Sequence, residues 1–435
     1  MKLFVGLDVS LEKTAICVLS EHGKIVKEVQ VASEPEALLR WINDQDGAIA
    51  AVGLEAGPLS QWLHRGLSVA GQPVVLMETR QVKGALKAMP IKTDRRDAEG
   101  IARLLHLGWF RPVHCKSVSA QEVRAVLSAR KAVQQGFITL EMSLRGLLRN
   151  FGLKVGTISR GRFEQRIREL AAGNPMLEAA TEPMLSARSA LRRELAGLER
   201  HVRQRAQEDP VCRRLMSMPG IGAVVALTYR SAVDDPDRFT SSKKVGPWVG
   251  LTPSRNQSGE RDISGGITKA GDVNLRRALC QAATAMMHRG RASWLRTWAA
   301  KLARRRGAKR AMVALARRIA VILHRMWKDD IDFHFDSPVI HAGCPPDRGP
   351  SRSPRDAVPM MPCSGLMPIT SSTPMRWAHR NCIEPASCWR PSRRPRTEAC
   401  TRVDLSGRLP NRKADHFLSR QKPQFGGASR MCKTA

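Results

Sequence analysis

The sequence predicts a mixed α/β domain at the N-terminus, then long helices, then a second and mainly α-helical domain. Three observations lead to this prediction. Residues 1–112 alternate short apolar runs with turn signals and amphipathic segments, and residues 118–208 repeat leucines at helical spacing. Residues 210–335 place glycine-rich turns between apolar helices. The 435 residues are enough for two or three domains of ordinary size.

The N-terminal region is expected to begin with three antiparallel strands. Two short apolar runs are followed by the turn signal EHGK and by a segment that alternates apolar and polar residues, as a half-exposed strand does. Helices and strands then alternate, which gives the order β-β-β-α-β-α-β-α. The predicted strands are 4–9, 14–19, 25–31, 48–54 and 74–77, and the predicted helices are 34–43, 59–70 and 94–107.

Few common folds begin with a three-strand meander and then alternate helices with strands. The ribonuclease-H-like fold does so, and so does the related actin-like ATPase fold. The second type needs glycine-rich phosphate loops in both halves, whereas the second half of this chain is helical and basic. We therefore favour the ribonuclease-H-like fold for residues 1–112.

Residues 113–209 are expected to form two long helices with a looser stretch, residues 152–161, between them. Leucines recur at three- and four-residue spacing, and the faces expected to be exposed are basic. This pattern favours a coiled-coil arm, used for self-association or for straddling nucleic acid. A plain helical spacer is the alternative.

Residues 210–335 are expected to form the second compact domain. It opens with MPGIG (218–222) before an apolar helix, continues through a glycine- and serine-rich stretch, 246–271, and ends in helices 274–288 and 310–327. The MPGIG turn resembles, weakly, the glycine hairpin of proteins that bind the DNA backbone without sequence preference.

The last hundred residues, 336–435, differ from the rest. They contain 14 prolines and six of the ten cysteines, and no hydrophobic period persists. Such a segment does not bury enough apolar surface to fold, so we expect disorder. With 17 Lys and Arg against 7 Asp and Glu, the tail is either a nucleic-acid-binding extension or an aberrant, frameshifted or read-through end. We favour the second interpretation.

The net charge of +33, from 72 Lys and Arg against 39 Asp and Glu, indicates a polyanionic partner. Nucleic acid is favoured, because neutralising its phosphates releases counterions. A basic protein of membrane surfaces is the alternative. There is no 18-residue apolar run and no signal peptide, and the cysteines before residue 336 are scattered. We therefore expect a cytoplasmic, nucleoid-associated protein with no membrane partner and no disulfides in its folded part.

Four acids fall at positions where a catalytic site is expected. Asp8, in GLDVS, and Glu55, in VGLEAG, end two strands that are neighbours in a ribonuclease-H-like sheet. Asp94 and Asp97 are three residues apart at the start of a helix, so they share one face of its first turn. Clustered carboxylates repel one another unless cations bind between them, and oxygen ligands suit Mg²⁺ or Mn²⁺. Two such ions support phosphodiester chemistry.

Each acid also has a plain structural explanation. Asp94 alone would serve as a helix cap, and Glu55 alone as a surface charge. The occurrence of all four at the right element ends favours the metal site. Two further acids, Glu78 and Glu99, are left unassigned.

The stretch WVGLTPSRNQSGERDISGGITKAGDVNLRRALCQAA (248–283) is the second candidate for chemistry. Ser258 and Ser264 each precede a glycine, which predicts a hydroxyl in an open, mobile backbone. A serine beside basic groups and a helix start is a possible nucleophile on phosphorus. From the residues alone, a phosphate-contacting loop without a covalent role is favoured. The basic candidates for nucleic-acid contact are Lys269, Arg276 and Arg277, together with Arg304, Arg305 and Arg306 of the basic stretch 301–318.

These motifs together resemble those of the DEDD transposases of bacterial insertion sequences that are guided by a bridge RNA, a group related to the pilin-gene invertases. The resemblance covers residues 1–335, and the chain departs from the family in its tail, since members usually stop near residue 335. The matching motifs are GLDVS (6–10), GLEAG (53–57), KTDRRDAEGIARLL (92–105), MPGIG (218–222) and GLTPSRNQSGERDISGGITKAGDVNLRRAL (250–279).

The resemblance implies a RuvC-like (resolvase-like) domain at 1–112, a coiled coil at 113–209 and a transposase domain at 210–335. It implies that Asp8, Glu55, Asp94 and Asp97 act with a serine that becomes linked to a DNA phosphate. By position that serine is Ser258, with Ser264 as the second choice.

The implied partners are the DNA of the element ends and the target, a guide RNA and further copies of the chain, in a dimer to tetramer. The predicted function is excision and insertion of an insertion sequence. A Holliday-junction-type endonuclease that uses metal and water alone, and a non-enzymatic nucleic-acid-binding protein, remain the alternatives.

Overall fold

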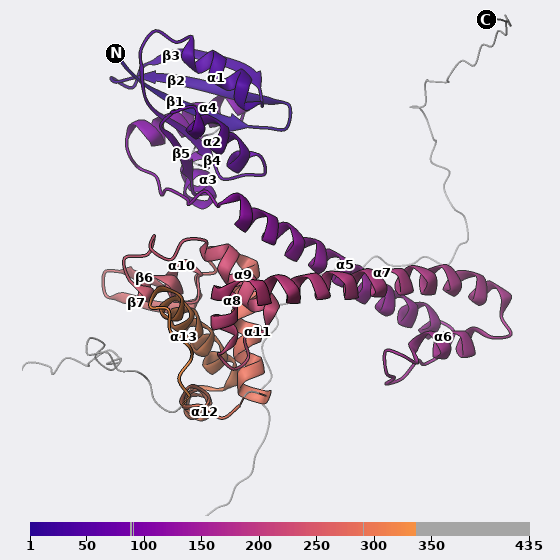
Figure 1. Cartoon of the computed structure of the whole chain (residues 1–435). Helices are drawn as coiled ribbons and strands as arrows, with labels where there is room; N and C mark the ends of the chain where they lie inside the picture. Colours follow the sequence, from indigo (N-terminus) through magenta and orange to yellow (C-terminus); the bar gives the residue numbers. More distant parts are fainter. Residues whose placement is uncertain (88, 90, 290, 336–435) are drawn as a thin grey trace, which may run out of the picture. The chain divides into compact units, whose positions relative to one another are not determined.

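The computed structural model describes residues 1–335 apart from positions 88, 90 and 290 (Figure 1). The tail for which we expected disorder, residues 336–435, lies outside the described residues. The four cysteines of the described part are free thiols. None of the helices described is long and apolar enough to cross a membrane.

The N-terminal part of the chain forms a five-stranded sheet with the order β3-β2-β1-β4-β5. β1 pairs antiparallel with β2, and β2 with β3, so the predicted meander is confirmed. β4 pairs with β1, and β5 with β4, in parallel. The elements are β1 (Lys2–Val9), β2 (Lys13–Ser20), β3 (Ile25–Ala32), α1 (Pro35–Asn43), β4 (Ala48–Glu55), α2 (Ser60–Val69), β5 (Val74–Met77), α3 (Thr79–Leu86) and α4 (Asp94–His106).

Helices cover both faces of this sheet. Successive side chains of a strand point to opposite faces. In β1, Leu3, Val5 and Leu7 are buried in one cluster with residues of α1 and α2. Phe4 instead packs with residues of α4. α4 therefore covers the face opposite to α1 and α2, and the predicted α/β architecture is confirmed.

Two long helices, α5 (Val118–Arg149) and α7 (Pro175–Glu208), occupy the middle of the chain with the short α6 (Phe163–Ala171). α5 and α7 pack against each other (Figure 1). Fully buried Arg188 joins them, because its guanidinium bonds to a glutamate of α5 and a glutamate of α6, each at 2.6 Å. The helical character predicted for this region is confirmed.

The C-terminal part is a helical core with one small hairpin. Tyr229 is fully buried in this core and its hydroxyl donates to the Ala320 carbonyl at 2.8 Å. The early turns of α5 add Val123 and Leu127 to the same core. The elements are α8 (Pro210–Met216), α9 (Ala223–Val233), η1 (Ser242–Lys244), α10 (Val245–Trp248), β6 (Pro253–Ser258), β7 (Arg261–Ile267), α11 (Val273–Arg289), α12 (Trp294–Arg306) and α13 (Ala308–Lys328).

The structure corrects the sequence-based prediction in several places. α3, α8 and α12 were not predicted as helices. α3 buries only Val82, and α12 buries only Leu295 and Ala299, so neither shows an apolar stripe in the sequence. The open backbone expected around Ser258 is wrong, because β6 and β7 pair there as an antiparallel hairpin.

Candidate active site

Asp8 and Glu55 lie at the ends of neighbouring parallel strands. β1 and β4 pair with Gly6 opposite Gly53, and two residues further along each strand are Asp8 and Glu55. Because side chains alternate along a strand, each acid shares a sheet face with its glycine. That face is the one covered by α4, so both carboxylates lie on the α4 side of the sheet.

α4 approaches β1 closely because Gly6 has no side chain. A Cβ on Gly6 would lie 2.3 Å from the carbonyl oxygen of Ala98 and 2.4 Å from the nitrogen of Ala102. Asp97 immediately precedes Ala98, so this contact holds the first turn of α4 against the strand that carries Asp8. A side chain at position 6 would force the helix, and its acids, away from the sheet.

The first turn of α4 carries the other two acids. Thr93 is its N-cap, and the Thr93 hydroxyl accepts a hydrogen bond from the Arg96 backbone nitrogen at 3.3 Å. Asp94 is therefore not the cap, which removes its simplest structural explanation. Acids in a first turn also interact favourably with the helix dipole. Asp94 is exposed, whereas the Asp97 side chain is only 16% exposed.

Electrostatic interactions connect all four acids. Burial, and then the negative charges of Asp97, Asp94 and Glu55 in that order of size, together raise the pKa of Asp8 from 3.8 to about 6. Burial also raises the pKa of Glu55, and Asp97 adds to that rise, while Lys83 and a hydrogen bond from Thr79 oppose it. A cation bound among these carboxylates would relieve the repulsion on Asp8.

Two lysines currently balance part of this charge. The Lys83 ammonium lies 3.9 Å from a Glu55 carboxylate oxygen, and the Lys92 ammonium lies 3.8 Å from an Asp97 oxygen. In the described part of the chain, no three acidic, histidine or cysteine side chains lie close enough together to hold a metal ion. The four carboxylates suit Mg²⁺ or Mn²⁺ in chemistry and charge, and they would have to draw together around such an ion.

Ser258 is the last residue of β6, at the tip of the β6–β7 hairpin. It pairs with Arg261 across the two-residue turn of Gly259 and Glu260, where Gly259 has φ +56°. Ser264 lies in β7, opposite Arg255. Both serines are exposed, and within the described residues neither hydroxyl makes a hydrogen bond to a general base.

The predicted basic residues differ in what they contact. The Arg276 guanidinium donates to the carbonyls of Val249 and Ala270, at 2.9 and 2.7 Å, so it holds a loop together. Lys269 adopts a left-handed backbone with φ +55°, a costly conformation for a non-glycine residue. The remaining predicted cations are exposed and make no ion pair among the described residues: Arg277, Arg304, Arg305 and Arg306.

Comparison with protein families gives matches to both halves of this arrangement. A model described as Transposase IS116/IS110/IS902 family matches residues 212–299. A second model, a transposase model of the IS110 DEDD type, matches residues 5–152. The first therefore covers the hairpin with Ser258, and the second covers all four acids.

Curated relatives extend the match along most of the chain. The transposase of insertion sequence element IS1111A from Coxiella burnetii is 30% identical over 336 residues, 73% of this chain and 88% of the relative. The chain belongs to the IS116/IS110/IS902 family of transposases. A probable family 20 transposase from Pseudomonas aeruginosa is 30% identical over 289 residues, covering 62% of this chain and 82% of the relative. The transposase of element IS1328 from Yersinia enterocolitica is 26% identical over 242 residues, covering 55% and 71%.

As a member of this transposase family, the chain is an enzyme of DNA strand transfer. The family resemblance inferred from the sequence motifs is confirmed by these matches.

Some residues that position the acids were not predicted from the sequence. Gly6 and Gly53 each stand two residues before an acid, in GLD and GLE, and this repeated spacing was the available signal. Lys83 was missed because α3 itself was not predicted. The unassigned Glu99 is buried between Arg96 and Arg103, at 2.9 and 2.7 Å, which is a structural role.

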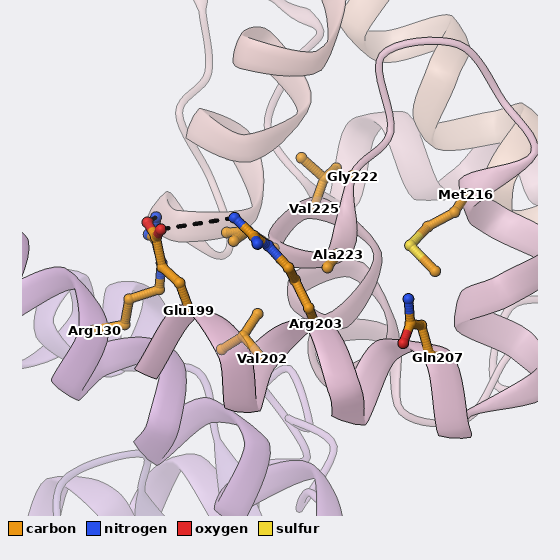
Figure 2. Close-up of a pocket in the computed structure, with 10 residues that line it drawn as sticks. Arg130, Glu199, Val202, Arg203, Gln207, Met216, Gly222, Ala223 and Val225 are labelled. Carbon is orange, nitrogen blue, oxygen red and sulfur yellow. Dashed lines mark hydrogen bonds and ion pairs between the residues drawn. The ribbon is translucent and has the colours of Figure 1, made fainter. Parts of the chain in front are cut away.

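A cavity of about 450 Å³ lies between α5, α7 and the start of α9 (Figure 2). Arg130 and Arg203 lie beside Glu199 at its wall, with nitrogen–oxygen distances of 2.7 and 4.0 Å. None of the residues predicted for the active site lines this cavity. The acids lie elsewhere, at the ends of β1 and β4 and at the start of α4.

Proposed function

We propose that this transposase excises and inserts an insertion sequence with a composite site. One half comprises Asp8, Glu55, Asp94 and Asp97, which would hold Mg²⁺ or Mn²⁺. The other half is the β6–β7 hairpin, in which Ser258 would attack the DNA phosphate. The observation that carries the proposal is the placement of the four acids: Asp8 and Glu55 end the paired strands β1 and β4, and Gly6 lets the start of α4, with Asp94 and Asp97, approach β1 closely.

The acids would prepare the phosphate for attack. A divalent cation held there would polarise a phosphate oxygen and stabilise the charge that develops during strand cleavage. Asp8 and Glu55 would be the fixed ligands, because both sit on strand ends of the sheet. Asp94 and Asp97 would complete the set from the helix that Gly6 holds against β1.

Ser258 would carry out the covalent step. Its hydroxyl oxygen attacks the scissile phosphorus, a serine–phosphate bond forms, and the bond from phosphorus to the departing deoxyribose oxygen breaks. The serine proton is balanced by the proton that the departing oxygen gains as a hydroxyl. A hydroxyl of another strand then attacks the serine-linked phosphate, which restores a phosphodiester and releases the serine. The exposed hairpin tip gives the hydroxyl free access to a phosphate.

The finer parts of the proposal follow the family. The strand order β3-β2-β1-β4-β5 supports a ribonuclease-H-like, RuvC-like domain over residues 1–112. The packing of α5 against α7 supports a coiled-coil arm over residues 113–209. The transposase domain would follow at residues 210–335. A guide RNA and assembly into a dimer or tetramer belong to the same proposal, as does a cytoplasmic location on the nucleoid. The net charge of +33 supports nucleic-acid partners.

Replacement of the two serines tests the covalent step. The full chain is incubated with element-end DNA and Mg²⁺, and the protein–DNA adduct is trapped by denaturation and mapped by mass spectrometry. We expect an adduct at Ser258 that disappears in Ser258→Ala and persists in the matched control Ser264→Ala. An adduct at Ser264, or cleavage at the normal rate by Ser258→Ala, would contradict the assignment.

One observation favours a second candidate, a nuclease that cuts with metal and water alone. Within the described residues, neither Ser258 nor Ser264 donates a hydrogen bond to a base that would activate it. Cleavage without any protein–DNA adduct in the same experiment would support that candidate.

A further inference from the structure

We propose that Arg238 and Lys116 form a binding site for a backbone phosphate of a nucleic acid. The site lies where the segment before α5 meets the segment after α9, apart in sequence from the acids and from Ser258. It rests on the proposed nucleic-acid function but on none of the catalytic residues.

Arg238 is a partly buried cation that has no hydrogen-bond acceptor among the described residues. Its guanidinium stacks over the rings of Phe239 and Trp248, with 4.5 Å to each centroid. Two of its nitrogens, Nε and Nη2, are buried and make no hydrogen bond in the described structure. Burial lowers the pKa of this guanidinium. Buried donors that lack an acceptor are costly, so this arrangement indicates a missing anionic partner.

Lys116 is a second cation in the same place. Its backbone is held on both sides, because its nitrogen donates to the Gln61 side chain and its carbonyl accepts from Gln121. Its ammonium has no ion-pair partner among the described residues. Burial lowers the pKa of Lys116, and the charges of Arg124 and Arg238 lower it further. Ser117, the residue after Lys116, bonds to Asp234, four residues before Arg238, and this contact brings the two cations to one place. A phosphate bound there would meet both charges.

The nearby carboxylates are already committed to other donors. Asp234 accepts from the backbone nitrogen of Ser117 at 2.8 Å, from the Ser117 hydroxyl at 2.6 Å and from His114 at 2.7 Å. Asp272 accepts from Arg124 at 2.7 Å and caps the start of α11 by accepting from two backbone nitrogens. Both acids are thus held by other donors, and among the described residues neither forms a hydrogen bond or ion pair with Arg238 or Lys116.

The loop that carries Arg238 is held in place beforehand. His324 is fully buried, and its Nε2 atom bonds to the Pro236 carbonyl at 2.9 Å. The other ring nitrogen of His324 bonds to the Ser242 hydroxyl at 2.9 Å. Arg238 lies between these two anchors, so a ligand would not have to order the loop.

A phosphodiester is the ligand that fits this chemistry. A planar guanidinium offers paired donors to phosphate oxygens, and an ammonium adds a second charge. The aromatic floor of Phe239 and Trp248 orients the guanidinium without using its donors. DNA and RNA present the same phosphate group, and the experiment below separates them.

The test measures oligonucleotide binding by the full chain as salt is varied. Probes are a duplex DNA and a single-stranded RNA of the same sequence, and the variants are Arg238→Met and Lys116→Met. Each variant is expected to lower the slope of log K against log salt by about 1, the loss of one phosphate contact. If the slope falls with DNA alone, with RNA alone or with both, that result identifies which nucleic acid supplies the phosphate.

Arg145→Met is the matched control. Arg145 stacks on Phe163 at 5.2 Å, but its guanidinium already donates to the Gly156 carbonyl at 2.8 Å. The same charge is lost in the control, and we expect its slope to stay at the wild-type value. Slopes that are unchanged in both test variants, for both probes, would overturn the inference.

A second measurement, thermal stability with added phosphate, tests the site without any recombination assay. Inorganic phosphate is added at constant ionic strength, and the Tm of the wild type is expected to rise while the Tm of Arg238→Met is not. An equal rise in both proteins would overturn the site. A chain that fails to cleave DNA but shows both expected effects would refute the proposed catalytic function and support this inference.

Discussion

The two halves of the proposed composite site are built in opposite ways. The acids lie at strand ends and on a helix that contacts the sheet at Gly6. A Cβ added to Gly6 would lie only 2.3 Å from the Ala98 carbonyl oxygen of that helix. Ser258 sits at the tip of a two-stranded hairpin whose strand residues are exposed apart from the last. Packing therefore fixes the acidic half, whereas the serine half is fixed mainly by backbone pairing and by the exposed Arg255–Asp262 ion pair. In the proposal, the fixed strand ends would carry acids that draw together around a metal ion, and the exposed hairpin would carry a nucleophile that has to reach DNA.

Asp8→Asn should break the acidic half and have the largest effect. Loss of one charged ligand weakens the metal site, and several kcal/mol of transition-state stabilisation correspond to a loss of about a thousandfold or more in strand cleavage. Cleavage is measured on element-end DNA with Mg²⁺. Glu122→Gln, an exposed acid of α5, is the control and should cleave normally. Recombination by Asp8→Asn at the wild-type rate would refute the metal site.

Gly6→Ala should separate the sheet from α4. The new Cβ would overlap the backbone of α4, and overpacking of this kind costs about 1–3 kcal/mol in the free energy of unfolding. Cleavage should fall as well, because the acids move apart. The control is Gly146→Ala in α5, where a Cβ would meet nothing within 4 Å, and there stability should rise by about 0.5–1 kcal/mol. Equal denaturation midpoints for the two variants would contradict the close contact.

Without metal, the acidic half should lower the stability of the fold. The pKa of Asp8 is about 6 in the folded chain against 3.8 unfolded, so the folded state binds more protons between pH 4 and 6. Stability contributed by protonated Asp8 is then lost as the pH rises through that window. In chelator at pH 7, Asp8→Asn should be more stable than the wild type by about 1–2 kcal/mol, a value reduced for partial exposure of the group.

Added Mg²⁺ should reverse that order, because it stabilises only the protein with the intact acid set. Denaturant titrations of both proteins, with chelator and with Mg²⁺, measure the effect. A wild-type stability that does not change between pH 4 and 6 would count against the raised pKa.

Loss of a charge in the hairpin should have the smallest effect of these substitutions on the stability of the chain. Arg255 and Asp262 form a bidentate pair at 2.8 Å, but their side chains are 62% and 47% exposed, so water screens the pair. Asp262→Ala should leave the Tm of the chain unchanged while raising the amide exchange rates of β6 and β7. A clear fall in Tm would show that the hairpin is tied into the core more firmly than its exposure indicates.

The sequence predicted the acidic half better than the serine half for a physical reason. Buried strands leave a pattern, and the short apolar run over residues 4–9 marked β1 in the sequence. The hairpin leaves no such pattern, because its side chains are almost all exposed and its strands are defined by their mutual hydrogen bonds.

Tertiary contacts account for the other differences between prediction and structure. α12 is rich in arginine and buries only two residues, so its sequence shows no apolar stripe from which a helix could be predicted. Arg276 was expected to contact nucleic acid, yet its guanidinium bonds to backbone carbonyls that are 27 and 6 residues away in the chain. No local signal in the sequence distinguishes such an arginine from an exposed one.

A crystal structure of the chain grown with Mn²⁺ tests the central claim most directly. The account predicts anomalous density within about 2.0–2.3 Å of carboxylate oxygens of Asp8 and at least two of Glu55, Asp94 and Asp97. Lys83 and Lys92 should then have moved away from Glu55 and Asp97. Crystals with Mn²⁺ bound elsewhere, and with both lysine–carboxylate pairs intact at the sheet edge, would contradict it.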